Sequence, residues 1–401
     1  MKLMSGLTLF LVGALIVAAQ ADVALAGMRQ GPKIPPEVMA KLKQYDSPYY
    51  TIYSDLDPAK MPLIIARMTS VAQIYNERTK FLGGVVKSKF QLYIIGDPEL
   101  YKAAGGEAYG VSFADRLMGL VSVPDEFWHV VQHEAWHQFL HNAASDRLPG
   151  WLDEGMAEYF GESLWTGDGL VSGFLPKARY DRFMPRVKDG KIKPFKDIIL
   201  FKAKDWAGID DYDQGLTMIH FCLHAENGKY QKALVAFMKS VAGGATFEQA
   251  FSANFGNPDA LQKAYLAWWA TVSQESVVGR PRTQATVATL ASFLGRAWSQ
   301  GQKFDTADDF LKAAGDGSLK RNPKQALPDE LLKEALDRAA KLQDWSFEQQ
   351  ANKAAPPKLV LKQAAGATFT ATITLKQNLV DKVVVEVKEP APAPSAPKAG
   401  T

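Results

Sequence analysis

The sequence predicts an α+β fold in which a small mixed sheet precedes a helical subdomain, followed by further helices and a short β appendage. Three observations lead to this prediction. Residues 50–53 and 90–95 are short apolar runs typical of strands, and the segment 61–81 between them has the periodicity of a long helix. Helical patterns then dominate to about residue 343. Apart from a third predicted strand at 117–123, strand-like alternation returns only after Pro357.

The composition is that of an ordinary globular protein. With 401 residues, of which 47% are hydrophobic and 22% charged, the chain is long enough for two or three domains. A net charge of +3 is too small for a nucleic-acid footprint, and Lys and Arg do not cluster with aromatic residues. We therefore expect no nucleic-acid partner.

Residues 1–26 have the pattern of a secretory signal peptide. Lys2 precedes an apolar run at 7–19, and this run is shorter than the ~20 residues that a membrane-spanning helix needs. Two small-residue cleavage sites follow, at 19–21 and 24–26. The alternative is an uncleaved membrane anchor. We expect cleavage, and hence a secreted or periplasmic protein without stable membrane insertion.

The only cysteine, Cys222, lies in an apolar helical run at 218–223. An exported chain with one cysteine folds without an internal disulfide bond. We expect Cys222 to be a small buried side chain rather than a nucleophile or a ligand.

Changes of pattern divide the rest of the chain. A lead segment at 27–47 precedes the main domain at 48–278, and Gly279-Arg280-Pro281-Arg282 is predicted to be a linker. A helical region at 283–350 follows, with helices at 284–299, 305–314 and 328–343. A β module at 357–388 has strands at 359–361, 368–375 and 383–387, and the Pro/Ala-rich tail at 389–401 is predicted to be disordered.

Within the main domain the segment 127–140 contains His133-Glu134-x-x-His137. Residues four apart lie on one face of an α-helix, so both imidazoles can bind the same Zn²⁺. In a chain of this composition the expected number of His-acid-x-x-His matches is roughly 0.01. The motif therefore predicts a zinc site with one ion per chain.

Glu154 is the candidate third ligand, with Asp153 as its nearest competitor. Residues 138–153 leave room for a chain reversal at Pro149-Gly150 and for a second helix that returns a carboxylate to the metal. Glu154 is preferred for two reasons. Gly155 allows close packing against the first helix. Glu158 lies four residues on, where it would accept the free ring N–H of a ligand histidine.

Glu134 lies beside the two ligand histidines but cannot easily reach the same ion. It is instead the candidate general base, which accepts a proton from the water activated by zinc and passes it to the leaving group. Trp136 and Phe139 are expected in the core. His129 and His141 continue the spacing of four but rotate by ~40° at each step, so they are expected on the surface.

The motif and the later segment Trp151-Leu152-x-Glu154-Gly155-x-Ala157-Glu158-Tyr159 resemble the gluzincin, or peptidase-MA-like, superfamily. This superfamily includes thermolysin-like proteases and the aminopeptidase N branch, and the chain looks closest to uncharacterised bacterial envelope members. The resemblance covers about residues 48–240. It implies His133, His137 and Glu154 as ligands and Glu134 as the base.

The resemblance implies two further features. A strand at 117–123, next to the metal helix, would be an edge strand, and Gly119–Val123 would pair with extended substrate. The alternative is an interior strand without a ligand role. A Tyr or His on a later helix would stabilise the oxyanion. Tyr212 is the first candidate and His220 the second, and the alternative is that both only cap and pack that helix.

The predicted function is that of an exported zinc metallopeptidase acting on a peptide or protein substrate. No Gly-x-Met-x-Asn segment of the aminopeptidase type occurs, so endopeptidase and exopeptidase action both stay open. One alternative is a zinc amidase acting on envelope peptides or glycans. Another is a non-catalytic protein with a structural zinc site, which binds an envelope partner through its C-terminal region. Glu134 argues against this last alternative, because a structural site needs no base.

Overall fold

The computed structural model describes residues 30–389 except 83–85, 87, 108, 114, 122–123, 145–147, 202–204, 207 and 365. The predicted signal peptide and the tail from residue 390 lie outside the described residues. The fold is mixed α+β, as predicted. No helix in the described part of the chain is long and apolar enough to cross a membrane.

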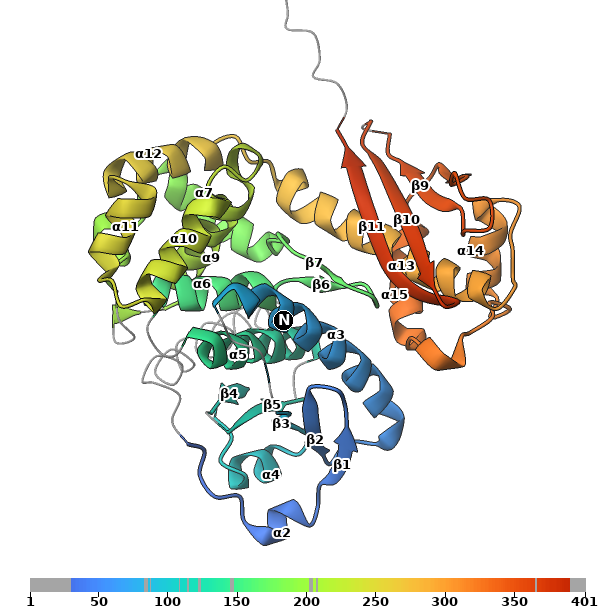
Figure 1. The fold of residues 1–401 in the computed structure, drawn as a ribbon, viewed down its shortest axis with the longest axis horizontal. Helices are drawn as coiled ribbons and strands as arrows, with labels where there is room; N and C mark the ends of the chain where they lie inside the picture. The colour runs from blue at the N-terminus through green and yellow to red at the C-terminus, as the bar shows by residue number, and fades with distance from the viewer. Residues whose placement is uncertain are drawn as a thin grey trace, which may run out of the picture. The chain divides into compact units, whose positions relative to one another are not determined.

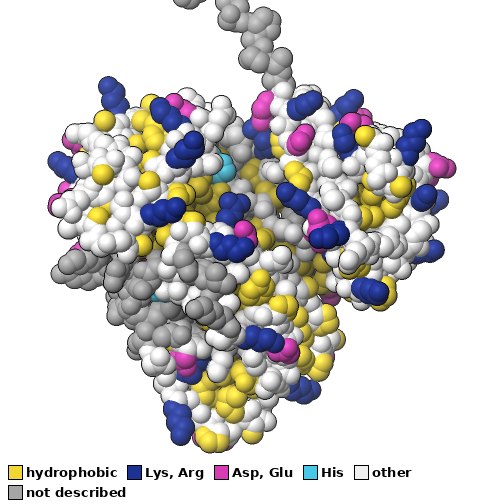
Figure 2. Space-filling view, in the orientation of Figure 1, with side chains coloured by type: hydrophobic (Ala, Val, Ile, Leu, Met, Phe, Trp, Pro, Cys, Tyr) yellow, Lys and Arg dark blue, Asp and Glu magenta, His cyan; other side chains and the backbone are white. Residues whose placement is uncertain are grey.

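The contacts divide the chain into two compact units. One unit runs to Leu164 and resumes at 172–281, and the other contains 165–171 and everything from Arg282 onward. Basic and acidic side chains are interspersed on the face drawn in Figure 2.

A five-stranded mixed sheet opens the first unit (Figure 1). Its order is β1 (Lys43–Asp46), β2 (Tyr50–Ser54), β3 (Phe90–Ile95), β5 (Arg116–Leu120) and β4 (Gly110–Ser112). β2, β3 and β5 are parallel, whereas β1 and β4 run antiparallel to their neighbours. The predicted strands at 50–53 and 90–95 are thus confirmed. Two strands were not predicted: β1, which lies in the predicted lead segment, and β4, which has three residues.

The prediction that 117–123 forms an edge strand is wrong. β5 is hydrogen-bonded on both sides, to β3 and to β4, so its backbone has no free edge for a substrate. The edge next to the metal helix is β4 instead. β4 was missed because three residues are too few to show an alternating pattern.

The first unit also contains short and long helices. The short ones are α2 (Pro36–Met39), η1 (Pro58–Lys60), η2 (Lys80–Leu82), α4 (Pro98–Ala103), α8 (Phe195–Ile198) and η5 (Ala225–Asn227). The longer ones are α3 (Met61–Thr79), α5 (Pro124–Ala144), α6 (Gly150–Gly161), α7 (Lys177–Lys188), α9 (Ile209–His224), α10 (Gln231–Ala242), α11 (Phe247–Phe255) and α12 (Pro258–Trp269).

Helix α5, which carries the His-Glu-x-x-His motif, is buried between the sheet and α6 (Figure 1). Trp136 stacks on Phe160 of α6 at 4.2 Å between ring centroids and meets Tyr75 of α3 edge-on. Phe139 packs against the same Tyr75 and against Phe90 of β3. Trp136 and Phe139 are thus core residues, as predicted, and they fix the orientation of the helix.

Helices α6 and α9 touch through their backbones. A Cβ atom at Gly155 would lie 2.6 Å from the carbonyl oxygen of Gly215. Glycine at 155 is therefore needed for close packing, as predicted, but its neighbour is α9 rather than the metal helix.

The residues of the predicted linker at 279–282 are helical, although the division between the two units falls among them, between Pro281 and Arg282. A π-helical turn, η6 (Glu275–Gly279), leads directly into α13 (Arg280–Ser299). Pro281 has no N–H to donate to the carbonyl of Val277 four residues earlier. The N–H of Leu175 donates to that carbonyl instead, at 2.9 Å, so the helix continues through the proline.

The second unit contains α13, α14 (Ala307–Gly315), η7 (Pro323–Gln325), α15 (Asp329–Ala339) and a four-stranded antiparallel sheet. Its order is β11 (Leu379–Lys388), β10 (Thr368–Lys376), β9 (Lys358–Lys362) and β8 (Trp345–Glu348). The three predicted strands are present, and β8 was missed. A two-residue turn joins β10 to β11, with positive φ at Gln377 and Asn378, as hairpin turns of this length require.

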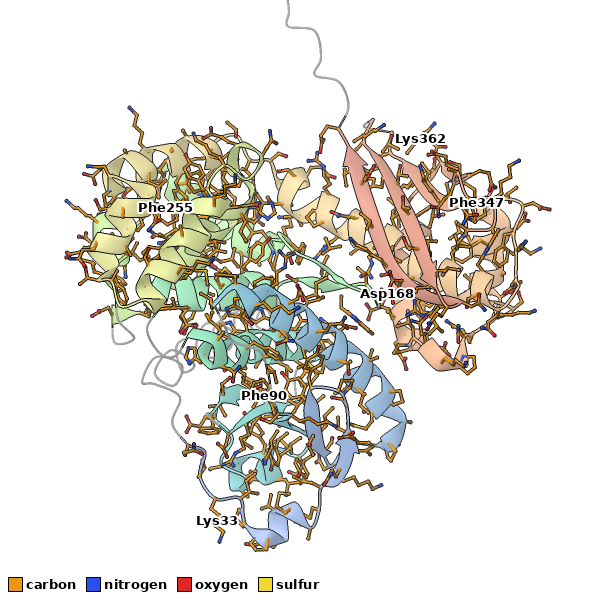
Figure 3. All side chains as sticks on the ribbon, viewed as in Figure 1. Lys33, Phe90, Asp168, Phe255, Phe347 and Lys362 are labelled. Carbon is orange, nitrogen blue, oxygen red and sulfur yellow. The ribbon has the colours of Figure 1, made fainter. Side chains whose placement is uncertain are left out.

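A small hairpin of β6 (Leu164–Trp165) and β7 (Leu170–Val171) carries Asp168 at its tip (Figure 3). The guanidinium of Arg296 donates to both carboxylate oxygens of Asp168, at 2.7 and 2.6 Å. This bidentate pair holds the hairpin tip to α13 within the second unit.

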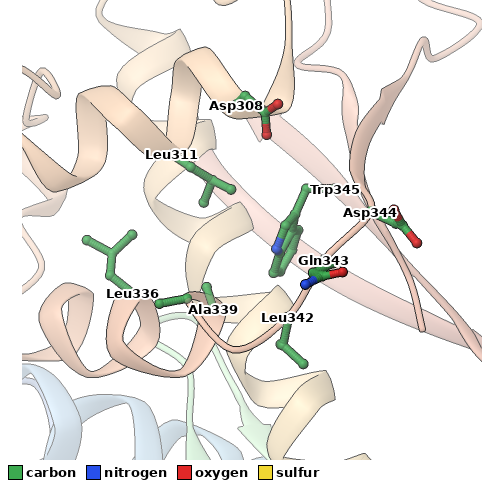
Figure 4. Close-up of a pocket in the computed structure, with 9 residues that line it drawn as sticks. Asp308, Leu311, Leu336, Ala339, Leu342, Gln343, Asp344 and Trp345 are labelled. Atoms are coloured by element: carbon green, nitrogen blue, oxygen red, sulfur yellow. The ribbon is translucent and has the colours of Figure 1, made fainter. Parts of the chain in front are cut away.

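The second unit also contains a pocket of about 540 Å³ (Figure 4). Its lining combines apolar and polar side chains and contains no histidine: Asp308, Leu311, Leu336, Ala339, Ala340, Leu342, Gln343, Asp344 and Trp345. It therefore lacks the residues of a transition-metal site.

Candidate metal centre

Two rows of side chains face each other between α5 and α6. Four histidines spaced by four residues lie along α5: His129, His133, His137 and His141. Carboxylates of α6 and its C-terminal cap approach them: Asp153, Glu154, Glu158 and Glu162. The two central histidines are buried, and so are Asp153, Glu154 and Glu158.

Three donor atoms converge at the centre of these rows. The Nε2 atoms of His133 and His137 lie 3.1 Å apart. Oε2 of Glu154 lies 3.3 Å from Nε2 of His133 and 3.7 Å from Nε2 of His137. The structure thus brings together the three predicted ligands in a group that could hold a metal ion.

The donor set fits a zinc ion. Zn–N distances of about 2.0–2.1 Å with tetrahedral angles place neighbouring ligand atoms roughly 3.3 Å apart. Both carboxylate oxygens of Glu154 are buried and have no hydrogen-bond partner among the described residues. A buried carboxylate without a partner is costly unless a cation compensates it. His133, His137 and Glu154 are therefore the residues that would hold the ion.

Each central histidine presents its other ring nitrogen to a further carboxylate. Nδ1 of His137 lies 2.8 Å from Oδ1 of Asp153, and Nδ1 of His133 lies 3.4 Å from Oε1 of Glu158. Such contacts fix the tautomer and the ring orientation of a metal ligand. Glu158 is where the sequence predicted it. Asp153 was considered only as a rival third ligand, and its contacts are with the outer side of His137.

The outer histidines are paired rather than lying as a bare surface stripe. Nε2 of His141 lies 2.8 Å from Oδ2 of Asp153, and this histidine side chain is 7% exposed. His129 lies between Glu158 and Glu162, at 3.5 and 3.3 Å, and is 17% exposed. These two histidines are rotated off the ligand face, as expected, but they lie beside neighbouring carboxylates. The prediction that they lie on the surface was therefore wrong.

Burial and charge compete in setting the pKa values here. Burial alone would lower the pKa of His133 and of His137, but the carboxylates beside them raise both above the ordinary value. Burial would raise the pKa of Glu154, but the neighbouring histidines hold it below its usual range. The cluster therefore favours anionic carboxylates next to positive charge, which a bound metal ion supplies directly.

Arg179 of α7 supplies the fixed positive charge behind the cluster. Its guanidinium is 2.5 Å from Glu158, 2.8 Å from Glu162 and 3.4 Å from Asp213. Burial would raise the pKa of Glu158, but Arg179 and the nearby histidines lower it to about 2. Glu158 thus stays anionic beside His133. The sequence showed no signal for Arg179, because its partners lie on α6 and its C-terminal cap and on α9, away from α7 in the chain.

Glu134 is held by the edge strand. The hydroxyl of Ser112 in β4 lies 2.7 Å from Oε2 of Glu134 and 2.8 Å from the Glu134 carbonyl oxygen. Both side chains are buried. Among the described residues, Glu134 is in none of the groups whose ligand atoms converge. This fits a base beside the ligands rather than a fourth ligand.

The two oxyanion candidates lie on α9. Tyr212 is fully buried in the first turn of this helix, and its ring packs against Trp206 at 5.4 Å. Nε2 of His220 donates to the carbonyl of Gly173 at 3.0 Å, and its ring packs against Trp268 and Trp269. These contacts of His220 are all outside the His133, His137 and Glu154 cluster. An oxyanion role for either residue stays a prediction.

No protein-family model matches the chain, and no curated protein matches it in sequence. The geometry of the cluster is therefore the basis for a functional proposal.

Proposed function

We propose that this chain is a zinc-dependent metallopeptidase of the gluzincin type, with peptides or proteins as substrates. One observation carries the proposal. Nε2 of His133, Nε2 of His137 and Oε2 of Glu154 converge at 3.1 to 3.7 Å, as a tetrahedral zinc site with one position left for water or substrate requires. When bound, zinc would act as a Lewis acid and bring the pKa of a water molecule to about 7.

The residues around the ion would then have distinct roles. Glu134 accepts the proton of the attacking water and delivers it to the leaving amine. Ser112 orients the Glu134 carboxylate through its 2.7 Å contact. Asp153 and Glu158 hold the ligand histidines in the tautomer that leaves Nε2 free for the metal.

The edge strand β4 is the proposed place for an extended substrate. It carries Ser112, which contacts the base, and a Cβ atom at Gly110 would lie 3.4 Å from Cγ of Glu134. A peptide added to β4, which is an edge strand among the described strands, would thus run past the base. This replaces the rim predicted at Gly119–Val123.

Export is part of the proposal. The apolar run at 7–19 and the cleavage sites after it support a signal peptide at 1–26 and a secreted or periplasmic location. The C-terminal unit, with its separate sheet, supports a role in binding an envelope partner.

The test is peptide cleavage by the wild-type protein and by Glu134→Gln. Gln keeps the size and the hydrogen bond of the side chain but cannot accept the proton. We expect Glu134→Gln to cleave the peptide at least 10²-fold more slowly than the wild type and to contain the same amount of zinc. If the wild type cleaves amide bonds of envelope glycopeptides but not ordinary peptides, the amidase alternative replaces the peptidase. Equal activity in the two proteins would reject Glu134 as the base.

A further inference from the structure

Strand β11 is an edge of the second unit's sheet. Among the described strands it pairs only with β10. Its residues alternate between half-buried positions facing the core and exposed positions on the other face of the sheet. The exposed row at 382–386 is Lys382, Val384 and Glu386, and Lys388 continues it at the end of the strand. Val384, 40% exposed, is one of two large apolar side chains exposed in the described part of the chain.

This row is complementary to itself. In an antiparallel pair of two identical strands, positions equally distant from the symmetry axis lie opposite each other. With the axis at Val384, Lys382 lies opposite Glu386 of the partner subunit, and Glu386 opposite Lys382 of the partner subunit. The apolar Val384 would meet Val384 of the partner subunit. We propose that β11 pairs in this register with β11 of a second copy of the chain.

The core-facing row agrees with the same register. Val383 and Val385 are half-buried, and among the described strands β11 has a neighbour on one side only. In the proposed pair Val383 lies opposite Val385 of the partner subunit. These valines would cover one another at the edge of each hydrophobic core. Cross-strand neighbours of this kind approach to about 5 Å between Cβ atoms.

Other registers of the β11 pair are disfavoured, either because they lose the Lys–Glu pairs or because they place exposed residues opposite core-facing residues. A shift of one residue would place the exposed row opposite the core-facing row. A shift of two residues in one direction would place Lys382 opposite Lys388 of the partner subunit. The shift of two in the other direction would leave Lys382 and Glu386 opposite valines.

The strand also has a natural limit for such pairing. The N–H of Val380 donates to Oε1 of Gln325 at 2.7 Å, and Nε2 of Gln325 donates to the carbonyl of Val380 at 2.8 Å. The side-chain amide of Gln325 thus takes the place of a neighbouring strand at this residue. The ladder between two copies would cover 382–386.

The charge pair allows a sharp test in the full chain by sedimentation equilibrium over a range of concentrations. We expect the wild type to dimerise, and Lys382→Glu and Glu386→Lys each to weaken the dimer by at least tenfold. The double variant, with both charges exchanged, should recover the dimer. Mixing the two single variants should give a heterodimer, because one then carries two acidic and the other two basic residues in the row.

The control is Lys362→Glu, which makes the same charge change on β9 (Figure 3), a strand with neighbours on both sides. It should leave the dimer unchanged. A wild type that stays monomeric at every concentration would overturn the proposal. So would a dimer that the single variants do not weaken, or that the double variant and the mixture do not restore.

Discussion

Nδ1 of His137 lies 2.8 Å from Oδ1 of Asp153, on the side of the ring opposite to Glu154. Asp153 and Glu154 are adjacent in sequence, yet they approach opposite nitrogen atoms of the same imidazole. This relationship separates the two acidic residues by role. Glu154 faces the proposed ion, and Asp153 orients the ligand and also contacts His141.

Asp153→Asn should weaken zinc binding without abolishing it. The amide keeps the shape of the side chain but loses the charge that supports His137 and His141, and changes of this kind cost about 10- to 100-fold in metal affinity. Competition with a chelator of known affinity measures the effect. His141→Gln is the matched control and should cost less, because it leaves the Asp153 contact with His137 in place. If Asp153→Asn removes zinc completely while Glu154→Gln retains it, the roles of the two acids are reversed.

Ser112→Ala should lower kcat with little change in zinc content. The variant removes the hydroxyl that contacts Glu134, and hydrogen bonds to charged groups contribute about 1.5–3 kcal/mol, so we expect roughly a 10- to 100-fold loss. Steady-state kinetics on a peptide substrate, beside metal analysis, provide the measurement. An unchanged kcat would mean that Glu134 is positioned by other contacts.

Gly155→Ala should destabilise the protein. The new methyl group would lie 2.6 Å from the Gly215 carbonyl oxygen, so α6 and α9 must separate, at a cost of about 1–3 kcal/mol. Thermal unfolding of the metal-free protein gives the comparison. Gly315→Ala is the control, because nothing lies within 4 Å of a Cβ atom at that helical position. Equal melting temperatures for Gly155→Ala and wild type would refute the close contact.

Cys222 should be unreactive in the folded protein. Burial raises the pKa of its thiol to about 12, so almost no thiolate is present at pH 8, and the side chain is 3% exposed. A thiol-specific colorimetric reagent should detect no free thiol in native buffer and one per chain in denaturant. Rapid labelling under native conditions would contradict the buried placement.

His220 should make the protein less stable in acid. Burial lowers its pKa to about 3, against an ordinary value of about 6.5, so between these values the unfolded chain binds the additional proton. The free energy of unfolding therefore falls as the pH drops below 6.5, by about 2–3 kcal/mol at pH 4.5 from this residue. His220→Gln keeps an N–H for the Gly173 carbonyl and cannot titrate. Denaturant unfolding should show a shallower loss between pH 6.5 and 4.5 in this variant, and parallel curves would contradict the assignment.

Local patterns predicted much of the fold. The helix at 61–81, the strands at 50–53 and 90–95 and the C-terminal hairpin follow from periodicity that neighbouring residues carry. Features set by distant contacts were missed. The proline at 281 indicated a linker, but Leu175, far away in sequence, supplies the hydrogen bond that lets the helix pass.

The same distinction holds at the site. His133 and His137 share one helix, so their convergence could be predicted from spacing alone. Ser112, Asp153 and Arg179 join the site through the packing of β4, α6 and α7 around α5. Residue type does not identify them, because Ser, Asp and Arg occur throughout the surface of any protein. The edge strand was misassigned for the same reason, since the order of strands in a sheet is a tertiary property.

The most direct test of the account is the zinc content of the purified protein, measured by mass spectrometry for the wild type, His137→Ala, Glu154→Ala and the control His224→Ala. The account predicts one zinc per chain in the wild type and the control, and none in the other two variants. A wild type that binds no zinc even after zinc is added back, or variants that retain it, would contradict the three-ligand site.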